Sequence, residues 1–392
     1  MREVVIVSGA RTPMGSFQKS LSKVSAPRLG AVAIKAAVER AGVPVEEIDE
    51  VLMGCVLQGG LGQAPARQAA IYAGLPTSVG ATTIHKVCGS GLKTVMLASQ
   101  MIRSGDADVI VAGGMENMSQ APYVLPKART GQRMGHGQML DLMIHDGLWD
   151  PYKDIHMGTV GELCASERQI SRETQDAYAT ESYRRANASV SEGLFKAEIA
   201  PVEIPPRRGE PLVVDTDEEP AAGRPDKFAG LRPAFDKEGS ITAANASTIN
   251  DGASAVVVMS REKADALGIK PMARIVSLGA HAQDPEWFTT APAAAIRNAV
   301  DKGGITLGDV DYFEINEAFS VVSLAVASEL EVDLERVNPR GGAVALGHPI
   351  GASGNRILVT LLHTLKDTGK RYGCAGICLG GGEAVSVLVE AL

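Results

Sequence analysis

The chain contains two copies of one sequence pattern, and this duplication limits its possible folds more than any other feature. Residues 33–54, "AIKAAVERAGVPVEEIDEVLMG", align without a gap with residues 295–316, "AIRNAVDKGGITLGDVDYFEIN", at an offset of 262. Further along, "HKVCGSG" at 85–91 matches "HPIGASG" at 348–354 at an offset of 263, and "GGME" answers "GGGE". Such self-similarity indicates two copies of one folding unit.

Each copy has the pattern of alternating strands and helices. "EVVIVSGARTP" and "IDEVLMGCV" predict buried strands, and residues 29–41 predict a helix that Gly42 ends. This order is typical of an α/β unit with a mostly parallel sheet, and the two copies are expected to share a helix layer. We predict a first half from residues 1–118 plus 249–268, a loop domain at 119–248, and a second half at 269–392.

The stretch between the two copies breaks the pattern. It is rich in proline, glycine and charge, and its one clear helix spans Ser171 to Glu192, with Ser171 as the predicted cap. Long irregular excursions in a compact protein are usually lids, ligand walls or oligomer contacts. A surface insertion with no role is the alternative.

Composition excludes several functions. The net charge is −8 and no Lys/Arg run exceeds two residues, so a nucleic-acid surface has no support. No apolar run approaches the ~18 residues of a membrane span. The chain begins as a strand, so we expect no leader peptide and a cytoplasmic location. Five cysteines without paired zinc spacing predict reduced thiols and no metal site.

Cys88 is the first candidate for chemistry. The glycines that follow it at 89 and 91 let a ligand approach the backbone, and they place Cys88 or Ser90 near a helix N-cap. The positive end of a helix favours a thiolate, which makes Cys88 a nucleophile candidate. A small buried cysteine packed under a helix is the alternative.

Three further residues stand at strand ends or helix starts. His348 lies in the turn that matches the Cys88 turn by pseudo-symmetry, Asn316 follows a strand, and Cys378 ends the last apolar run before three glycines. Taken singly, each can be structural: a hydrogen-bonded histidine, a turn asparagine, a core cysteine. Ligands of open α/β sheets bind at the carboxyl ends of strands, so the four residues are expected to meet there.

The motifs "VCGSG", "NEAF", "GHPIGASG" and "CLGGG", in this order on a duplicated unit, resemble the thiolase family over the whole chain. Within it, the similarity is closest to the short-chain acetyl-CoA acetyltransferases of bacterial type. The resemblance implies the five-layer αβαβα fold with an inserted loop domain, a homotetramer or dimer, coenzyme A thioesters as substrates, and chemistry without a metal or prosthetic group.

Carried over by position, the resemblance makes Cys88 the acyl-accepting nucleophile, His348 its base, and Cys378 the group that takes and returns the α-proton. It implies one oxyanion site from His348 with a water held by Asn316, and a second from the backbone N–H groups of Cys88 and Gly380. It also implies a set of substrate and coenzyme A contacts. These are His156, Met157, Arg224, Lys227, Ala246, Ser247 and Phe319. Residues 121–143 resemble the tetramerisation loop.

The chain departs from the family pattern in two places. Where relatives commonly have Met and glycines, this chain reads "DPEWFTTAP", and we predict that Phe288 lines the acyl pocket and favours acetoacetyl-sized thioesters. Cys164 stands where a non-thiol residue is usual, and we expect it to be inert.

The sequence therefore predicts an acyltransferase that condenses two acetyl-CoA to acetoacetyl-CoA and CoA through an acetyl-cysteine. Two alternatives stay open. One is a degradative 3-ketoacyl-CoA thiolase of broader chain length, and the other, which the intact set of reactive residues argues against, is a non-catalytic acyl-CoA-binding scaffold. The physiological direction does not follow from the sequence.

Overall fold

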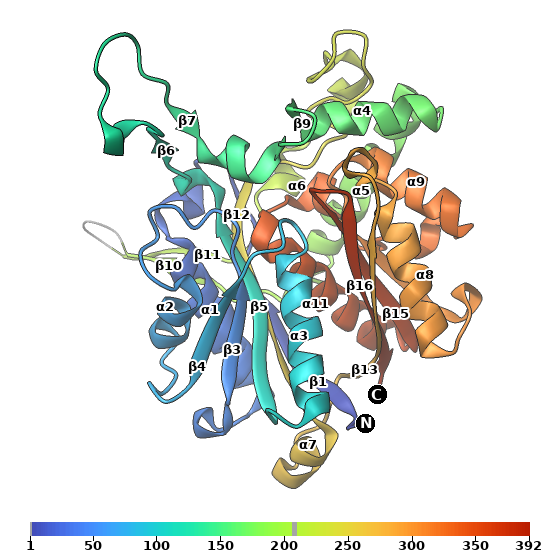
Figure 1. Cartoon of the computed structure of the whole chain (residues 1–392). Coiled ribbons are helices and arrows are strands. Elements are labelled where there is room, and N and C mark those ends of the chain that lie inside the picture. The colour runs from blue at the N-terminus through green and yellow to red at the C-terminus, as the bar shows by residue number, and fades with distance from the viewer. Residues whose placement is uncertain (1, 206–209) are drawn as a thin grey trace.

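The computed structural model describes residues 2–205 and 210–392, and it arranges them in five layers (Figure 1). Two sheets alternate with three helix layers, and helices α3 (Ser90–Ser104) and α11 (Ile350–Thr368) pack against each other between the sheets. Helices α1 (Ala26–Ala41) and α2 (Pro65–Tyr72) cover the outer face of the first sheet, and α8 (Ala291–Gly303) and α9 (Ser320–Leu330) cover that of the second. The predicted α/β class and five-layer thiolase-type architecture are confirmed.

The two sheets follow the two sequence copies. The first contains, in spatial order, β4 (Gly80–Ile84), β3 (Glu50–Gly54), β5 (Val109–Asn117), β12 (Asn250–Ser260) and β1 (Val4–Arg11), with β2 (Gly15–Ser16) beside β12. The second contains β13 (Ala273–Ala282), β16 (Glu383–Ala391), β15 (Tyr372–Leu379) and β14 (Tyr312–Ile315). Among the described strands, the two sheets are joined where Val5 and Ile6 of β1 pair with Arg274 and Ala273 of β13.

The prediction of a mostly parallel sheet is wrong. Only β3–β4, β3–β5 and β14–β15 pair in parallel among the described strands of these sheets, and the other neighbours are antiparallel. The reason is the last strand of each copy, which returns beside its predecessor without a crossover helix. In the second copy, a turn at Gly381 and Gly382, with φ of 91° and 79°, folds β15 directly onto β16. In the first copy, the whole stretch 118–249 occupies the same connection, between β5 and β12.

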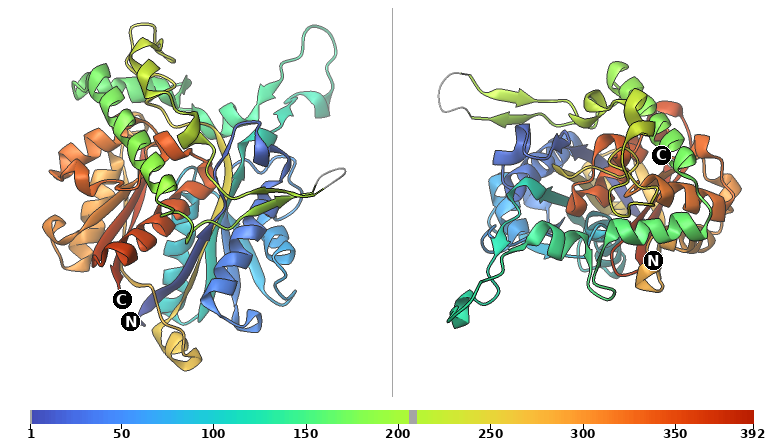
Figure 2. Two further views of the ribbon diagram at one scale, coloured as in Figure 1. Left: turned by 180° about the vertical axis from the view of Figure 1, so that it is seen from behind. Right: turned by 90° about the horizontal axis from the view of Figure 1, so that it is seen from above.

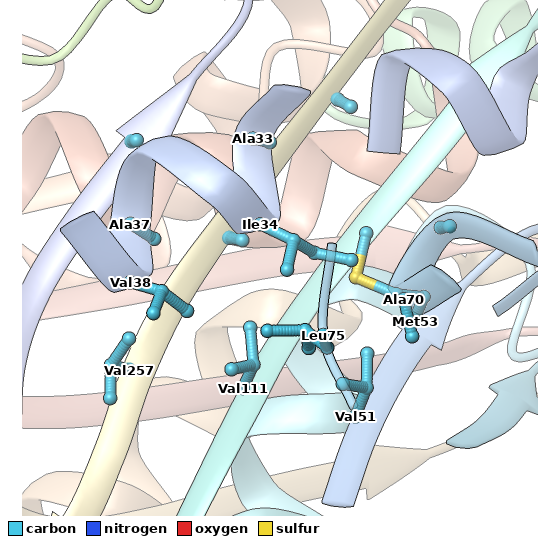
Figure 3. Packing of buried hydrophobic residues seen from close by; sticks show 14 of the residues in the cluster. Ala33, Ile34, Ala37, Val38, Val51, Met53, Ala70, Leu75, Val111 and Val257 are labelled. Atoms are coloured by element: carbon cyan, nitrogen blue, oxygen red, sulfur yellow. The ribbon is translucent and has the colours of Figure 1, made fainter. Parts of the chain in front are cut away.

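Helix α1 (Ala26–Ala41) shows how the outer helices attach to the sheets. Its buried side chains recur at three- and four-residue spacing, and Ile34, Ala37 and Val38 face Val111 of β5 and Val257 of β12 (Figure 3). Each fully buried valine or isoleucine stabilises such a contact by about 1.5–3 kcal/mol. The helix starts three residues before the predicted Leu29 and ends, as predicted, at Gly42, whose φ is 66°.

The inserted stretch carries more regular structure than predicted. Helix α5 (Arg172–Ser191) confirms the expected helix, and the Oγ of Ser171 accepts a hydrogen bond from the N–H of Thr174. Helix α4 (Met157–Glu167) was not predicted, because its cap is a histidine: Nδ1 of His156 accepts from the N–H of Gly158. Short strand pairs complete the stretch, and it extends above the sheets and to both sides (Figures 1 and 2).

The remaining helices and short strands have the following bounds. The helices are α2 (Pro65–Tyr72), α6 (Glu219–Ala222), α7 (Arg261–Leu267), α8 (Ala291–Gly303), α9 (Ser320–Leu330) and α10 (Ala343–Leu346). The strands are β6 (Tyr123–Val124), β7 (Leu140–Asp141), β8 (Trp149–Asp150), β9 (Ile155–His156), β10 (Val202–Ile204) and β11 (Leu212–Val214). Within the described ranges, none of the helices combines the length and apolarity that crossing a bilayer requires.

Candidate active site

Cys88 lies in a tight turn between β4 and α3. The residue before it, Val87, has a φ of 43°, a left-handed conformation that costs a β-branched residue about 1–3 kcal/mol. The hydroxyl of Ser90 supports this turn, because its Oγ accepts from the N–H of Lys86 at 2.8 Å and donates to the carbonyl of Val87 at 2.6 Å. Cys88 and Ser90 lie on either side of the helix N-cap, as expected; the N-cap itself is Gly89, and no side chain caps this helix.

His348 lies in the matching turn before α11, and its neighbours fix its orientation. Its N–H donates to Oδ1 of Asn250 at 3.0 Å, and its Nδ1 lies 2.6 Å from Oγ of Ser353. The Ser353 hydroxyl donates its single proton to the carbonyl of Pro349 at 2.9 Å, so it accepts from Nδ1–H of the imidazole. The opposite ring nitrogen, Nε2, then carries the lone pair, at 3.5 Å from Nδ2 of Asn316.

Cys378 and Asn316 come from neighbouring parallel strands. Cys378 is the second-last residue of β15, and Asn316 directly follows β14, so both reach the same edge of the second sheet. Asn316 is fully buried, and its Oδ1 has no hydrogen-bond partner among the described residues. A buried, unpaired carbonyl oxygen is a ready acceptor for a water or ligand donor.

Most of the predicted residues line one small cavity of about 60 Å³. The predicted residues in its lining are Cys88, His156, Met157, Ser247, Phe288, Phe319, His348, Cys378 and Gly380. Asn316 contacts His348 behind this lining, and Ala246 forms a backbone bridge with Phe319. The sequence therefore placed the two thiols, the imidazole and their glycine turn correctly in one pocket.

Two predicted contacts lie outside the cavity lining. Arg224 and Lys227 are exposed, on and beside a single 3-10 turn at Pro225–Gly230, and Arg224 pairs with Asp226 at 3.4 Å. Their predicted contact with the nucleotide end of coenzyme A stays a prediction.

Sequence reasoning missed four residues that complete the lining: Gly147, Leu148, Ala318 and Leu379. Ala318 and Leu379 lie inside the motifs "NEAF" and "CLGGG", so their positions could have been found. Gly147 and Leu148 belong to the irregular insertion, where no periodicity pointed to them.

Aromatic rings form the wall opposite the thiols. The ring centroids of Phe288 and Phe319 lie 6.5 Å apart in an edge-on arrangement, and Phe235 contacts Phe319 from behind at 6.1 Å. Phe235 also stacks on His156 at 4.8 Å. Phe288 is 2% exposed and belongs to the buried hydrophobic cluster behind the cavity, so its ring is a fixed part of the cavity wall.

Comparison with known proteins identifies the family. Residues 4–262 match the family described as "Thiolase, N-terminal domain", and residues 269–391 match "Thiolase, C-terminal domain". The chain belongs to the thiolase family. Proteins named acetyl-CoA acetyltransferase from Cupriavidus necator and Pseudomonas aeruginosa share 54% and 53% identity with this thiolase, over 100% and 99% of both chains. A protein of Escherichia coli named probable acetyl-CoA acetyltransferase is 50% identical over 100% of this chain and 99% of its own length.

Burial dominates the electrostatics of the thiolase cavity. It raises the pKa of Cys88 to about 12, while the backbone N–H groups of Cys88 and Gly380 act in the opposite direction by favouring the sulfur anion. The nearby carboxyl group of Glu116 adds to the increase. The predicted preference for a thiolate at the start of the helix is therefore outweighed by burial in the free site.

The other two reactive groups are also neutral. Burial raises the pKa of Cys378, and the proximity of Cys88 adds to that shift. Burial lowers the pKa of His348 to about 3, with the buried guanidinium of Arg356 as a second cause. A neutral imidazole with a free Nε2 lone pair can accept a proton from a thiol.

Cys164, by contrast, lies outside the cavity lining, fully buried and with a raised pKa, in keeping with the inert role predicted for it.

No group of three or more His, Cys, Asp or Glu side chains suited to a metal ion occurs in residues 2–205 and 210–392.

Proposed function

We propose that this thiolase is an acetyl-CoA acetyltransferase, which condenses two acetyl-CoA reversibly to acetoacetyl-CoA and CoA through an acetyl-Cys88 intermediate. One observation carries the proposal: Cys88, Cys378 and His348 line a single cavity of about 60 Å³. Two thiols and an imidazole in one closed pocket suit transfer of a small acyl group, and a binding module would not need them together. The names of the relatives at about 50% identity point the same way.

In the first half-reaction, Nε2 of His348 takes the proton of the Cys88 thiol as the sulfur attacks the thioester carbonyl of acetyl-CoA. The tetrahedral oxyanion accepts hydrogen bonds from the backbone N–H groups of Cys88 and Gly380, the groups that already favour an anion at this sulfur. Losing one such donor typically costs about 3–4 kcal/mol of barrier. The intermediate then collapses, the bond from carbon to the CoA sulfur breaks, and the leaving thiolate receives the proton from His348.

In the second half-reaction, the Cys378 thiol passes its proton to Nε2 of His348, which is free again after the first step, and the Cys378 thiolate removes the α-proton of a second acetyl-CoA. The enolate oxygen is stabilised by protonated His348 and by a water that Asn316 holds, a role supported by the unpaired, buried Oδ1 of Asn316. The enolate carbon attacks acetyl-Cys88 and a carbon–carbon bond forms. The bond from the acetyl carbon to the Cys88 sulfur then breaks, and the sulfur takes the proton from His348. Thiolysis is the same sequence in reverse, with Cys378 returning the α-proton.

The size of the pocket favours short acyl groups over the broader range of a degradative 3-ketoacyl-CoA thiolase. A water needs roughly 10–15 Å³ of such volume, so a cavity of about 60 Å³ holds only a few heavy atoms. Phe288 and Phe319 close it on the side where a longer chain would extend.

Coenzyme A is proposed to reach the cavity past His156, Met157, Ala246 and Ser247, with Arg224 and Lys227 near its nucleotide end. The coenzyme is substrate and product, and the chemistry needs no further cofactor.

We also propose a homotetramer, or a dimer, in the cytoplasm. The excursion at 121–143 supports assembly, because it exposes large apolar side chains that a partner would cover. These are Tyr123, Leu125, Met134 and Met139. The cysteines of the described chain are free thiols, as is usual in a reducing compartment.

The proposal is tested by thiolysis of 3-ketoacyl-CoA substrates from four to sixteen carbons, including 2-methyl-branched thioesters, together with labelling by radioactive acetyl-CoA. We expect the four-carbon substrate to be strongly preferred and about one acetyl group per chain to be bound in a burst, which Cys88→Ala abolishes without loss of CoA binding. Equal turnover of eight-carbon substrates would support the degradative alternative. Complete inactivity would support the scaffold, and retained labelling in Cys88→Ala would place the nucleophile elsewhere.

A further inference from the structure

A second, much larger cleft lies at the far end of helix α11. Its volume is about 830 Å³, and its lining includes residues of β1, the end of α1 and the last turns of α11. Helix α11 starts next to His348 and runs for 19 residues, which is about 28 Å. The cleft contacts the last turns of this helix, so it is separate from the cavity at Cys88.

The lining of the cleft is strongly basic in a chain whose net charge is −8. It contains Arg40, Lys270, Lys366, Lys370 and Arg371, and no Asp or Glu side chain of the described residues lies in it. Leu392 also lines the cleft.

These cations are only partly neutralised by neighbours. Arg371 pairs with Glu390 at 2.6 Å, and Lys370 lies 3.8 Å from Asp311. Lys270 and Lys366 form no ion pair within the part of the chain that the structure describes. Two free ammonium groups facing one cleft repel each other, and an anion between them removes that cost.

Two further groups, Arg40 and His363, hold polar atoms at fixed positions in the cleft, in addition to the exposed lysines. The guanidinium of Arg40 is held in place, because it donates to the carbonyls of Gly9 at 3.2 Å, Glu198 at 3.0 Å and Ile199 at 2.7 Å. His363 lines the cleft and is 6% exposed, yet its Nε2 is buried without a hydrogen-bond partner among the described residues. A buried polar nitrogen in a basic cleft points to a missing ligand or water.

We propose that this cleft binds a small molecule that carries a chain of phosphate groups, such as a nucleoside triphosphate or a short inorganic polyphosphate. Several cations are spread over a large cleft, so a ligand with several linked anionic groups fits it better than a ligand with a single anionic group does. Lysine ammonium groups bind phosphate oxygens as point charges, and arginine donates to them through its planar fork. The site is independent of the thioester cavity and does not rest on the proposed reaction.

The test measures binding of ATP and of tripolyphosphate to the full-length protein by calorimetry at low salt. CoA is present at saturating concentration, so that it occupies the CoA-binding region and keeps both probes out of that region. We expect one saturable site per chain. Its affinity is expected to fall at least about tenfold when the salt concentration rises to about 0.5 M, because dissolved ions screen the attraction between these cations and the phosphates. The double variant Lys270→Gln/Lys366→Gln is expected to bind at least about tenfold more weakly. The matched control is Lys35→Gln/Lys302→Gln, which removes the same charge outside the cleft and is expected to bind within about twofold of wild type.

Tighter binding of ATP than of tripolyphosphate would assign the site to a nucleotide, and equal binding would assign it to the phosphate chain alone; both outcomes support the proposal. It is overturned if neither probe binds saturably at millimolar concentration, if CoA abolishes binding, or if the two double variants weaken binding equally. Unchanged thiolysis by the Lys270→Gln/Lys366→Gln variant would verify that its fold is intact, since both side chains are exposed.

Discussion

The Oγ atom of Ser353, which is not part of the cavity lining, lies 2.6 Å from Nδ1 of His348 and holds the imidazole in place. Both residues belong to the turn and first helical turn that the sequence repeat matched to the Cys88 turn. Since Ser353 donates its own proton to the carbonyl of Pro349, this contact selects the tautomer whose Nε2 is unprotonated. The tautomer of the proposed base is thus set by a hydroxyl outside the cavity lining.

Replacing this hydroxyl tests the positioning role. We expect Ser353→Ala to lower kcat by about 10- to 100-fold with little change in KM, because the imidazole loses its fixed tautomer while the binding surface stays intact. Ser353→Thr keeps the hydroxyl and is expected to recover most of the rate. The matched control is Ser99→Ala on α3, a buried serine whose Oγ has no partner among the described residues. Equal loss of kcat in both alanine variants would mean that the effect is on packing alone.

The two proposed thiol roles separate in a second experiment. We expect Cys378→Ala to keep the acetyl burst on Cys88 but to lose at least about 10³-fold in condensation and thiolysis, since the α-proton then has no acceptor. Cys374→Ala is the matched control, because Cys374 is equally buried on the same strand but does not line the cavity. Rapid condensation by Cys378→Ala, or an equal loss in Cys374→Ala, would contradict the assignment.

The repeat predicted the layers because it is a property of the whole chain. Two matched α/β units require helices on both faces of each sheet, and the pairing of α3 with α11 follows from the match between the turns of Cys88 and His348. Strand direction was not predictable in the same way. A short turn joins β15 to β16, and the irregular stretch 118–249 joins β5 to β12. The alternation of strands and helices therefore gave no information on the direction of β12 and β16.

The reactive residues were predictable because each lies in a short motif whose glycines and turn positions are local. The residues that position them were not. Asn250 binds the backbone of His348 from 98 positions away, and no local pattern links the two. The raised pKa of Cys88 was not predictable for a similar reason: the helix N-terminus is visible in the sequence, whereas the burial that raises this pKa depends on elements from both halves and the insertion.

Phe288 gives a prediction about chain length. We expect Phe288→Ala to raise kcat/KM for six- and eight-carbon 3-ketoacyl-CoA by about 10-fold or more relative to the four-carbon substrate, because removing the ring deepens the cavity, where each added methylene contributes about 1–3 kcal/mol. Trp287→Ala is the control: this neighbouring ring lies against Arg168, at 5.9 Å, and does not line the cavity. An unchanged preference in Phe288→Ala, measured on the same substrate series, would assign the limit to another part of the wall.

The buried imidazole also makes the stability of the protein sensitive to acid. The pKa of His348 is about 3 in the folded chain and about 6.5 when unfolded, so the unfolded state binds the proton first and stability is lost as the pH falls through this range. At pH 5 the loss from this one group is about 2 kcal/mol. We therefore expect His348→Asn, which has no such charge to acquire, to lose about 2 kcal/mol less than wild type between pH 7.5 and 5, measured by urea unfolding at fixed protein concentration. His136→Asn, an exposed histidine in the insertion, should follow wild type. Parallel losses in wild type and His348→Asn would show that burial of this ring does not govern the acid response.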